Sequence, residues 1–264
     1  MAYDATRGVT VLFGGYSGFA PLYDTWEYVD SEWREVNLTV SPPADHELQM
    51  VYDSRLEVCV LYETAERSTW HWDGAVWSAL NGPAGIGTEN GLVLAFAVLD
   101  DGSGPALYTG GTFDTAGGIT VNYVARWDGT TWSALTAPGG TGVDSGVGAL
   151  AVFDDGSGDR LFAGGGFTHA GGLRVNHIAR WDGQDWSPLA GPFGTGMSVP
   201  RGGVSAFGVF DDGQGPALFA GGAFGTAGGL YSENVGVWRC LPDIFADGFE
   251  TGTTLAWWET VPNP

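Results

Sequence analysis

The feature that most constrains the fold of this chain is a repeat of about fifty residues. The segment LDDGSGPALYTGGTFDTAGG at 99–118 matches FDDGSGDRLFAGGGFTHAGG at 153–172 and FDDGQGPALFAGGAFGTAGG at 210–229. Self-similarity at a regular period is typical of repeat architectures, in which each repeat forms one structural unit. Residue types that recur once per unit are therefore expected to build the fold.

The first third of the chain carries a shorter version of the same unit. Residues 1–15, MAYDATRGVTVLFGG, match residues 50–64, MVYDSRLEVCVLYET. The second copy departs from its neighbours where the diglycine Gly14-Gly15 is replaced by Glu63-Thr64. In total we predict five units, which begin near residues 1, 49, 94, 148 and 204.

Each unit divides into four short apolar runs separated by turn residues. In the fourth unit these runs are ALAVF, RLFAGGGF, HIARW and DWSPL. The 45 glycines and 12 tryptophans of the chain favour short strands joined by tight turns. Four antiparallel strands per repeat predict an all-β chain, folded as a β-propeller of about five four-stranded antiparallel blades.

Two groups of units resemble known propeller repeats. Units 1 and 2 combine an apolar–Tyr–Asp start, the run VTVLFGG and a Trp five residues beyond a Tyr, at Tyr28 and Trp33. In these features they resemble kelch repeats, and units 3 to 5 are similar to a related, glycine-richer repeat of bacterial proteins. The resemblance implies a kelch-like propeller over residues 1–240, followed by a C-terminal tail over 241–264.

The resemblance predicts a fold and leaves the activity open, because kelch-type propellers serve as enzymes, adaptors and surface proteins alike. Galactose oxidase, a copper enzyme on such a propeller, needs a cysteine cross-linked to a tyrosine, a second tyrosine and two histidines. Here Cys59 lies within an apolar strand, and no disulfide bond between Cys59 and Cys240 is predicted. The four histidines show no metal-ligand spacing and are His46, His71, His169 and His177. We therefore predict the propeller fold without its copper site.

An acidic turn follows the first strand of every unit. These turns begin at Asp4, Asp53, Asp100, Asp154 and Asp211. Because the first strands of a propeller line its channel, the turns are expected to gather around the axis on one face. A ring of carboxylates there could hold Ca²⁺, with the candidate ligands Asp100, Asp101, Asp154, Asp155, Asp211 and Asp212. The alternative is ordinary turn chemistry, since DDGSG lacks the ligand spacing of a dedicated calcium loop.

A second Asp motif recurs between the third and fourth strands. It reads HWDGAVW at 71–77, RWDGTTW at 126–132 and RWDGQDW at 180–186. Asp-Gly is a two-residue hairpin turn signal, because both residues tolerate positive φ. The flanking tryptophans are expected to pack between adjacent blades. A catalytic residue is normally present once, so these aspartates are predicted to shape turns, and no catalytic residue is predicted.

Charge restricts the partners that this chain can bind. The formal net charge is −21, with 31 acidic and 10 basic residues, so nucleic acid and anionic membranes are unfavourable partners. No apolar run is long enough to predict a membrane span. The glycine-rich loops at 115–118, 169–172 and 226–229 are expected on the face opposite the acidic turns, where propellers form ligand pockets. These loops offer backbone groups but few titratable side chains, and the favoured interpretation is that their glycines permit tight turns.

Two function hypotheses remain open. The first is a monomeric, non-catalytic scaffold that presents loops to a protein or glycan. The second is a carbohydrate-active enzyme at the channel mouth, which would need two carboxyl groups about 5–10 Å apart.

The ends of the sequence predict an incomplete propeller from a longer protein. The chain begins within a first strand, and its fifth unit loses the WDG continuation after VGVWRC. The missing outer strand is expected from residues 243–250 or from the opposite terminus. The tail DIFADGFETGTTLAWW resembles a C-terminal segment of exported bacterial proteins. It implies a secreted or cell-surface protein, whose signal peptide would lie upstream because MAYDATRG is not one.

Overall fold

The computed structural model describes residues 1–43, 48–64, 68–79, 87–191, 194–198, 202–211, 213, 215–232, 234–240 and 255–259. Their regular secondary structure consists of β-strands, which confirms the all-β prediction. None of these residues form a helix long and apolar enough to cross a membrane.

Five four-stranded antiparallel sheets make up most of the structure, one from each predicted unit. Sheet 1 contains β1 (Ala2–Asp4), β2 (Val9–Tyr16), β3 (Pro21–Val29) and β4 (Glu32–Val36). Sheet 2 contains β5 (Leu48–Asp53), β6 (Val58–Glu63), β7 (Ser68–Trp72) and β8 (Trp77–Ala79). Sheet 3 contains β10 (Val93–Asp100), β11 (Pro105–Gly111), β14 (Val124–Trp127) and β15 (Trp132–Ala134). Sheet 4 contains β18 (Val147–Asp154), β19 (Asp159–Gly165), β22 (Ile178–Trp181) and β23 (Trp186–Pro188). Sheet 5 contains β27 (Val204–Asp211), β28 (Pro216–Gly222), β31 (Val235–Cys240) and β32 (Leu255–Glu259).

Short hairpins connect the strands and the sheets. Within units 3, 4 and 5 they follow the second strand and are β12 (Thr115–Ala116) with β13 (Ile119–Thr120), β20 (His169–Ala170) with β21 (Leu173–Arg174), and β29 (Thr226–Ala227) with β30 (Leu230–Tyr231). Between units they are β16 (Thr136–Ala137) with β17 (Gly140–Thr141), and β24 (Ala190–Gly191) with β25 (Gly194–Thr195). Two further short strands, β9 (Thr88–Glu89) and β26 (Met197–Ser198), pair with β12 and β29.

The fourth strand of sheet 5 comes from the C-terminal segment. β32 pairs antiparallel with β31, so residues 255–259 of the predicted tail complete the sheet that lacks a WDG hairpin. Residues 243–250, which we had considered for this position, lie outside the described part of the chain. Every main sheet therefore has the same strand order as the chain itself, in agreement with the predicted unit.

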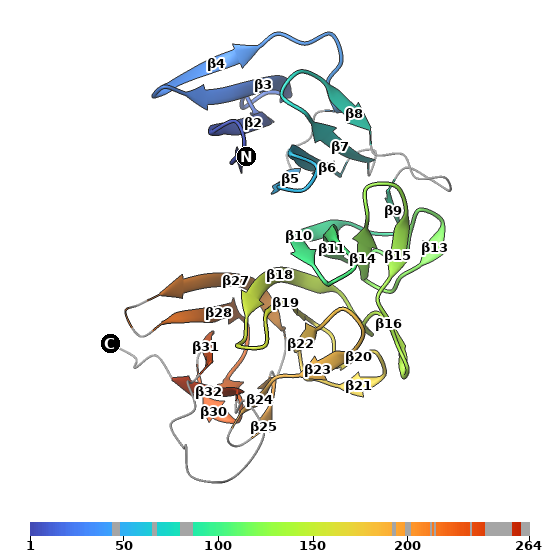
Figure 1. The fold of residues 1–264 in the computed structure, drawn as a ribbon, viewed down its shortest axis with the longest axis vertical. Coiled ribbons are helices and arrows are strands. Elements are labelled where there is room, and N and C mark those ends of the chain that lie inside the picture. The colour runs from blue at the N-terminus through green and yellow to red at the C-terminus, as the bar shows by residue number, and fades with distance from the viewer. Residues whose placement is uncertain are drawn as a thin grey trace.

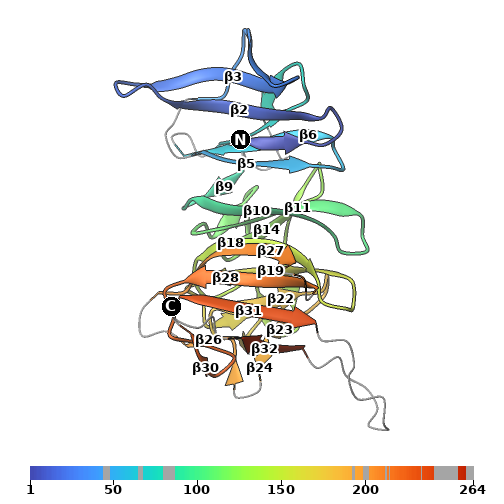
Figure 2. The same ribbon diagram turned by 90° about the vertical axis from the view of Figure 1, so that its left-hand side faces the viewer.

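The five sheets stand side by side in an arc (Figure 1). Successive first strands touch, β1 against β5, β5 against β10, β10 against β18, and β18 against β27. Sheet 1 and sheet 5 lie toward opposite ends of the arc in both views (Figures 1 and 2). In the part of the chain that the structure describes, the arc is open and does not form a closed ring.

The hydrophobic core consists of layers between neighbouring sheets. In the three layers between sheets 1 and 4, two tryptophan rings from the WDG hairpin of one sheet pack on the preceding sheet. In the layer between sheets 4 and 5, Trp238 packs on the preceding sheet. The ring centroids of Trp127 and Trp132 are 5.2 Å apart, and those of Trp181 and Trp186 are 5.3 Å apart. All four rings are buried. The structure thus confirms the predicted packing of these tryptophans between adjacent repeats.

The diglycines at the end of the second strand permit this close packing. A Cβ atom at Gly110 would lie 2.5 Å from Val147 Cγ1 of the next sheet. At Gly164 it would lie 2.6 Å from Val204 Cγ1 and 2.8 Å from Phe207 Cζ, again in the next sheet. All three distances are too short for a real side chain, so glycine is required at these two positions where sheets meet.

We expect Gly164→Ala to destabilise the fold by about 1–3 kcal/mol, because the added methyl group overpacks the layer between sheets 4 and 5. Gly221→Ala is the matched control. Gly221 has the same place in sheet 5, but its nearest neighbour for a Cβ is the carbonyl oxygen of Asn234 at 3.9 Å. Urea denaturation should show little change for Gly221→Ala, and equal losses for both variants would contradict the packing argument.

Candidate functional site

The acidic turns were the first candidate site, and their carboxylates bond to their own loops. Asp100 Oδ1 accepts hydrogen bonds from the backbone N–H groups of Gly102 (2.9 Å) and Gly104 (3.1 Å). Asp154 and Asp211 accept equivalent bonds in units 4 and 5. Each first aspartate therefore closes the turn that it begins, which agrees with the turn-chemistry alternative.

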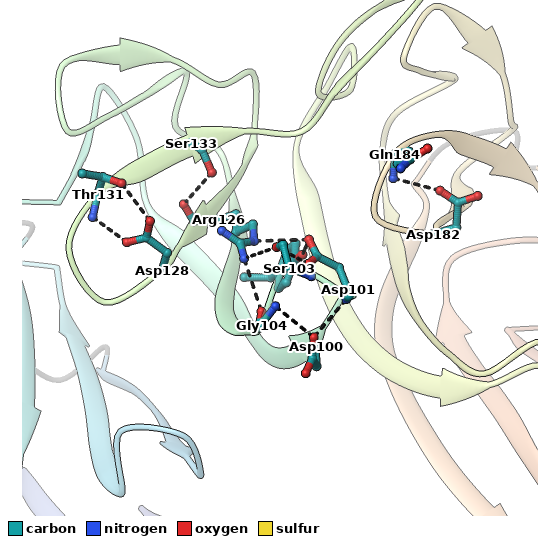
Figure 3. Close-up of polar contacts among 12 residues, drawn as sticks. Asp100, Asp101, Ser103, Gly104, Arg126, Asp128, Thr131, Ser133, Asp182 and Gln184 are labelled. Carbon is teal, nitrogen blue, oxygen red and sulfur yellow. Dashed lines mark hydrogen bonds and ion pairs between the residues drawn. The ribbon is translucent and has the colours of Figure 1, made fainter.

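The second aspartate of the turn is paired with arginine. Asp101 Oδ2 lies 3.3 Å from Arg126 Nε and accepts a hydrogen bond from the hydroxyl of Tyr108 at 2.7 Å. Figure 3 shows Asp101 directed toward Arg126 and Ser103. Burial alone would raise the pKa of Asp101, but hydrogen bonds from Ser103 and Tyr108 and the charge of Arg126 lower it. Arg126 also donates to the carbonyl of Gly104, so it binds the whole turn.

The same arrangement recurs in unit 4. Asp155 is fully buried and pairs with Arg180, which extends from the third strand of its sheet. In unit 5 the position of Arg126 and Arg180 is filled by Val237. Arg239, two residues further along β31, donates to the carbonyl of Gly215 at 3.3 Å. Asp212, the remaining calcium candidate, lies outside the described residues.

The predicted ring of ligands therefore does not assemble in the described part of the chain. No group of three or more His, Cys, Asp or Glu side chains comes together there as a possible metal site. The physical reason is that a guanidinium already neutralises Asp101 and Asp155, while the first aspartates bond to backbone amides.

The WDG aspartates also hold their own turns. Asp128 Oδ1 accepts the backbone N–H groups of Thr130 and Thr131, both at 2.8 Å, and its pKa lies well below the ordinary value. Burial alone would raise this pKa, but the hydrogen bonds from Thr131 and Thr130 outweigh it. Figure 3 shows Asp128 and Asp182 in separate turns. The prediction that these aspartates shape turns is confirmed.

The register of this turn differs from the prediction. We expected Asp128 and Gly129 as the two central residues of the hairpin, both with positive φ. Instead Trp127 pairs with Trp132, Asp128 N–H donates to the carbonyl of Thr131, and only Gly129 has positive φ, at 97°. The central pair is therefore Gly-Thr, a pattern that suits turns with glycine first.

One polar cluster, which sequence reasoning did not find, differs from its counterpart in unit 3, where Asn90 Nδ2 donates to Asp114 Oδ1 at 3.0 Å. Asp144 Oδ1 accepts the backbone N–H groups of Thr168 (2.7 Å) and His169 (2.9 Å). Asp144 Oδ2 lies 2.8 Å from Thr168 Oγ1 and 3.0 Å from His169 Nδ1. The slot of Thr168 is filled by Asp114 in unit 3 and by Gly225 in unit 5. This difference between aligned repeats was the signal available in the sequence.

A groove of about 400 Å³ lies beside this cluster, at the end of the inner strands opposite the acidic turns. Ser145, which follows Asp144, lies on its wall. Its lining residues are Leu94, Thr112, Ser145, Gly146, Gly148, Gly165, Gly166, Gly202, Gly203, Val204 and Ser205. They offer backbone groups, hydroxyls and small apolar side chains, and none of these described residues carries a titratable side chain. The groove can bind through hydrogen bonds but has no acid or base of its own.

A second cavity, of about 450 Å³, lies between the turns of sheets 4 and 5. Asp154 and Asp159 both line it and are direct cross-strand partners in sheet 4. The partner position is proline in units 3 and 5, at Pro105 and Pro216. This pair of carboxylates therefore occurs once among the aligned turns.

Cys59 and His177 occupy structural positions. Cys59 is a buried thiol in β6, and burial raises its pKa to about 12. His177 and Tyr123 have nearly the same φ, 69° and 70°, which confirms that they fill equivalent positions. His46 lies outside the described residues.

Neither a family model nor a curated protein matches the chain.

Calcium should leave the melting temperature unchanged, because arginine and backbone amides already satisfy the turn carboxylates. The measurement is thermal unfolding in EDTA and in about 5 mM calcium chloride, a concentration that would saturate a weak extracellular-type site. A rise of several degrees that disappears in Asp154→Asn would contradict this expectation and restore the calcium hypothesis.

Asp144 should make stability depend on pH. Burial alone would raise its pKa, but hydrogen bonds from His169 and Thr168 lower it to about 2. A carboxylate with a depressed pKa stabilises the fold above its unfolded pKa, and this stabilisation is lost as the pH falls through the folded pKa. We expect Asp144→Asn to melt below the wild type at pH 7, and the difference to shrink between about pH 4 and pH 2.

The control for this measurement is Glu32→Gln, which alters an exposed carboxylate of sheet 1. Its melting temperature should follow that of the wild type across the same pH range. A difference between Asp144→Asn and the wild type that stays constant down to pH 2 would contradict the assigned role of the carboxylate.

Proposed function

We propose that this chain is a kelch-type β-propeller scaffold that binds a glycan or protein ligand without catalysing a reaction. Five sheets of one topology stand side by side and touch through their first strands, which is the arrangement of propeller blades. Diglycines at the ends of second strands and aromatic pairs between sheets support the kelch resemblance. The count of five blades follows from this proposal.

The observation that carries the binding role is the chemistry of the glycine-lined groove. Its walls present peptide groups and the hydroxyls of Thr112, Ser145 and Ser205, without an acid, base or nucleophilic thiol. Peptide groups and hydroxyls are suited to a ligand rich in neutral hydrogen-bonding groups. Because the chain carries a net charge of −21, an anionic ligand is repelled. A neutral glycan therefore fits the groove better than an anionic ligand does.

The cluster beside the groove supports the same role. Asp144 makes four polar contacts with Thr168 and His169. These contacts fix the segment that leads into the groove, which forms the rim of the groove. A preformed rim lowers the conformational entropy that is lost when a ligand binds. His169 remains half-exposed and is available to a ligand at the rim.

We further propose that the protein is secreted or displayed on the cell surface of a bacterium. The support is the resemblance of residues 243–258 to a segment of exported proteins, together with the strongly acidic composition. A binding module for glycans or proteins is suited to that location.

Filling the groove tests the binding proposal. Gly166→Leu is suitable because its φ is not positive and a Cβ would meet only Ser145 Oγ, at 3.6 Å. Binding is first measured on an array of neutral oligosaccharides, and the affinity of any bound glycan is then measured by calorimetry. We expect Gly166→Leu to weaken binding at least about tenfold, or 1.4 kcal/mol, at an unchanged melting temperature.

Gly225→Leu is the matched control, since a Cβ at Gly225 meets nothing within 4 Å and the residue does not line the groove. It should bind as the wild type does. Equal affinity in the wild type and Gly166→Leu would contradict the groove assignment. Hydrolysis of a bound glycan that is abolished by Asp159→Asn would instead favour a carbohydrate-active enzyme, with Asp154 and Asp159 as its carboxylates.

A further inference from the structure

The two ends of the arc carry complementary halves of the contact that joins its sheets. Between sheets 4 and 5, Trp238 packs on the ring pair of Phe153 and Phe162, with centroid distances of 5.9 and 4.8 Å. Phe153 is only 4% exposed and Phe162 is fully buried. An aromatic ring from one sheet thus enters a phenylalanine pair on the sheet before it.

Among the described residues, sheet 5 presents the same phenylalanine pair without a following sheet. Phe210 and Phe219 occupy the positions of Phe153 and Phe162, and their rings have a similar edge-to-face geometry at 6.2 Å and 64°. Phe210 is 61% exposed. Gly221, two residues beyond Phe219 in β28, has only the carbonyl oxygen of Asn234 within 4 Å of a Cβ, whereas Gly164 meets the next sheet. We call Phe210, Phe219 and Gly221 the sheet-5 seat.

Sheet 1 presents the other half. The rings of Tyr28 and Trp33 lie 5.2 Å apart at 51° and occupy the positions of Trp72 and Trp77 in sheet 2. In sheets 2, 3 and 4 the corresponding rings are buried against the preceding sheet. In sheet 1 they are 40% and 44% exposed, because no sheet precedes it in the arc. We call Tyr28 and Trp33 the sheet-1 pair.

We propose that the sheet-1 pair of one molecule docks on the sheet-5 seat of a second copy of this chain. Both halves are present on every chain, and they lie at opposite ends of the open arc, where one molecule does not join them (Figures 1 and 2). The docked contact would repeat the packing of sheet 5 on sheet 4. It joins two different surfaces, so it is heterologous and builds closed rings or open chains of copies.

The contact should depend on salt as well as on apolar area. Each copy has a net charge of −21, so two copies repel one another at long range. Salt screens this repulsion while the aromatic contact is little affected. Association is therefore expected to strengthen as the ionic strength rises, the opposite of an interface held by ion pairs. The proposed assembly differs from the monomer that the sequence alone led us to expect.

The test combines two variants that each remove one half of the contact. Phe210→Glu places a charge in the sheet-5 seat, and Trp33→Glu places one in the sheet-1 pair. Sedimentation velocity over a range of concentrations should show that the wild type associates and that each variant alone is monomeric. An equimolar mixture of the two variants should form a heterodimer, because each supplies the half that the other lacks.

Leu173→Glu is the control, because Leu173 is an exposed apolar residue of β21 and belongs to neither end face. It should associate as the wild type does. The melting temperature of each variant is measured alongside, and if Trp33→Glu does not fold, Tyr28→Glu replaces it. A monomeric wild type at high salt, as closure of the ring within one molecule would give, overturns the proposal. Association that survives in both variants overturns it as well.

Discussion

The structure depends on the close approach of each sheet to the one before it. The aromatic rings of one sheet fill the layer against its predecessor, while glycines such as Gly110 and Gly164 let Val147 and Val204 come close. Because an added Cβ would overlap those valines, the spacing between sheets leaves no room for a larger residue. The arc, its buried core and the two unfilled end faces all follow from repeating this one contact.

The few basic residues stabilise the turns that this packing brings together. Arg7 pairs with Asp4 and Glu27 in sheet 1, and Arg126 and Arg180 bind the turns of sheets 3 and 4. Arg55 donates to the carbonyl of Asp128 and so connects the first turn of sheet 2 to the WDG turn of sheet 3. The carboxylate partners Asp4 and Asp155 are fully buried, whereas Arg34 pairs with the exposed Asp30.

Repeated and non-repeated positions have different roles in this structure. Aspartates that return in each unit bond to their own backbone, and returning tryptophans fill the layers between sheets. Positions that differ between units, such as Asp144, His169 and Asp159, lie beside the two cavities. The proposed binding groove and the proposed docking faces therefore depend on features that a consensus repeat would conceal, because each arises where one unit differs from the others or has no neighbour.

The amino-acid sequence by itself determined the number of units, the four strands in each, the aspartate turns and the buried tryptophan pairs. These features depend on contacts within a few residues or on a period that every unit shares. Only the tertiary structure decided the one-residue shift of the WDG turn, the use of residues 255–259 as the last strand of sheet 5, and the meeting of Asp144 with His169. Each of these features depends on which strands or distant segments pair with one another, as Val143 pairs with Ala170 in an isolated bridge. Local residue patterns do not specify such pairings.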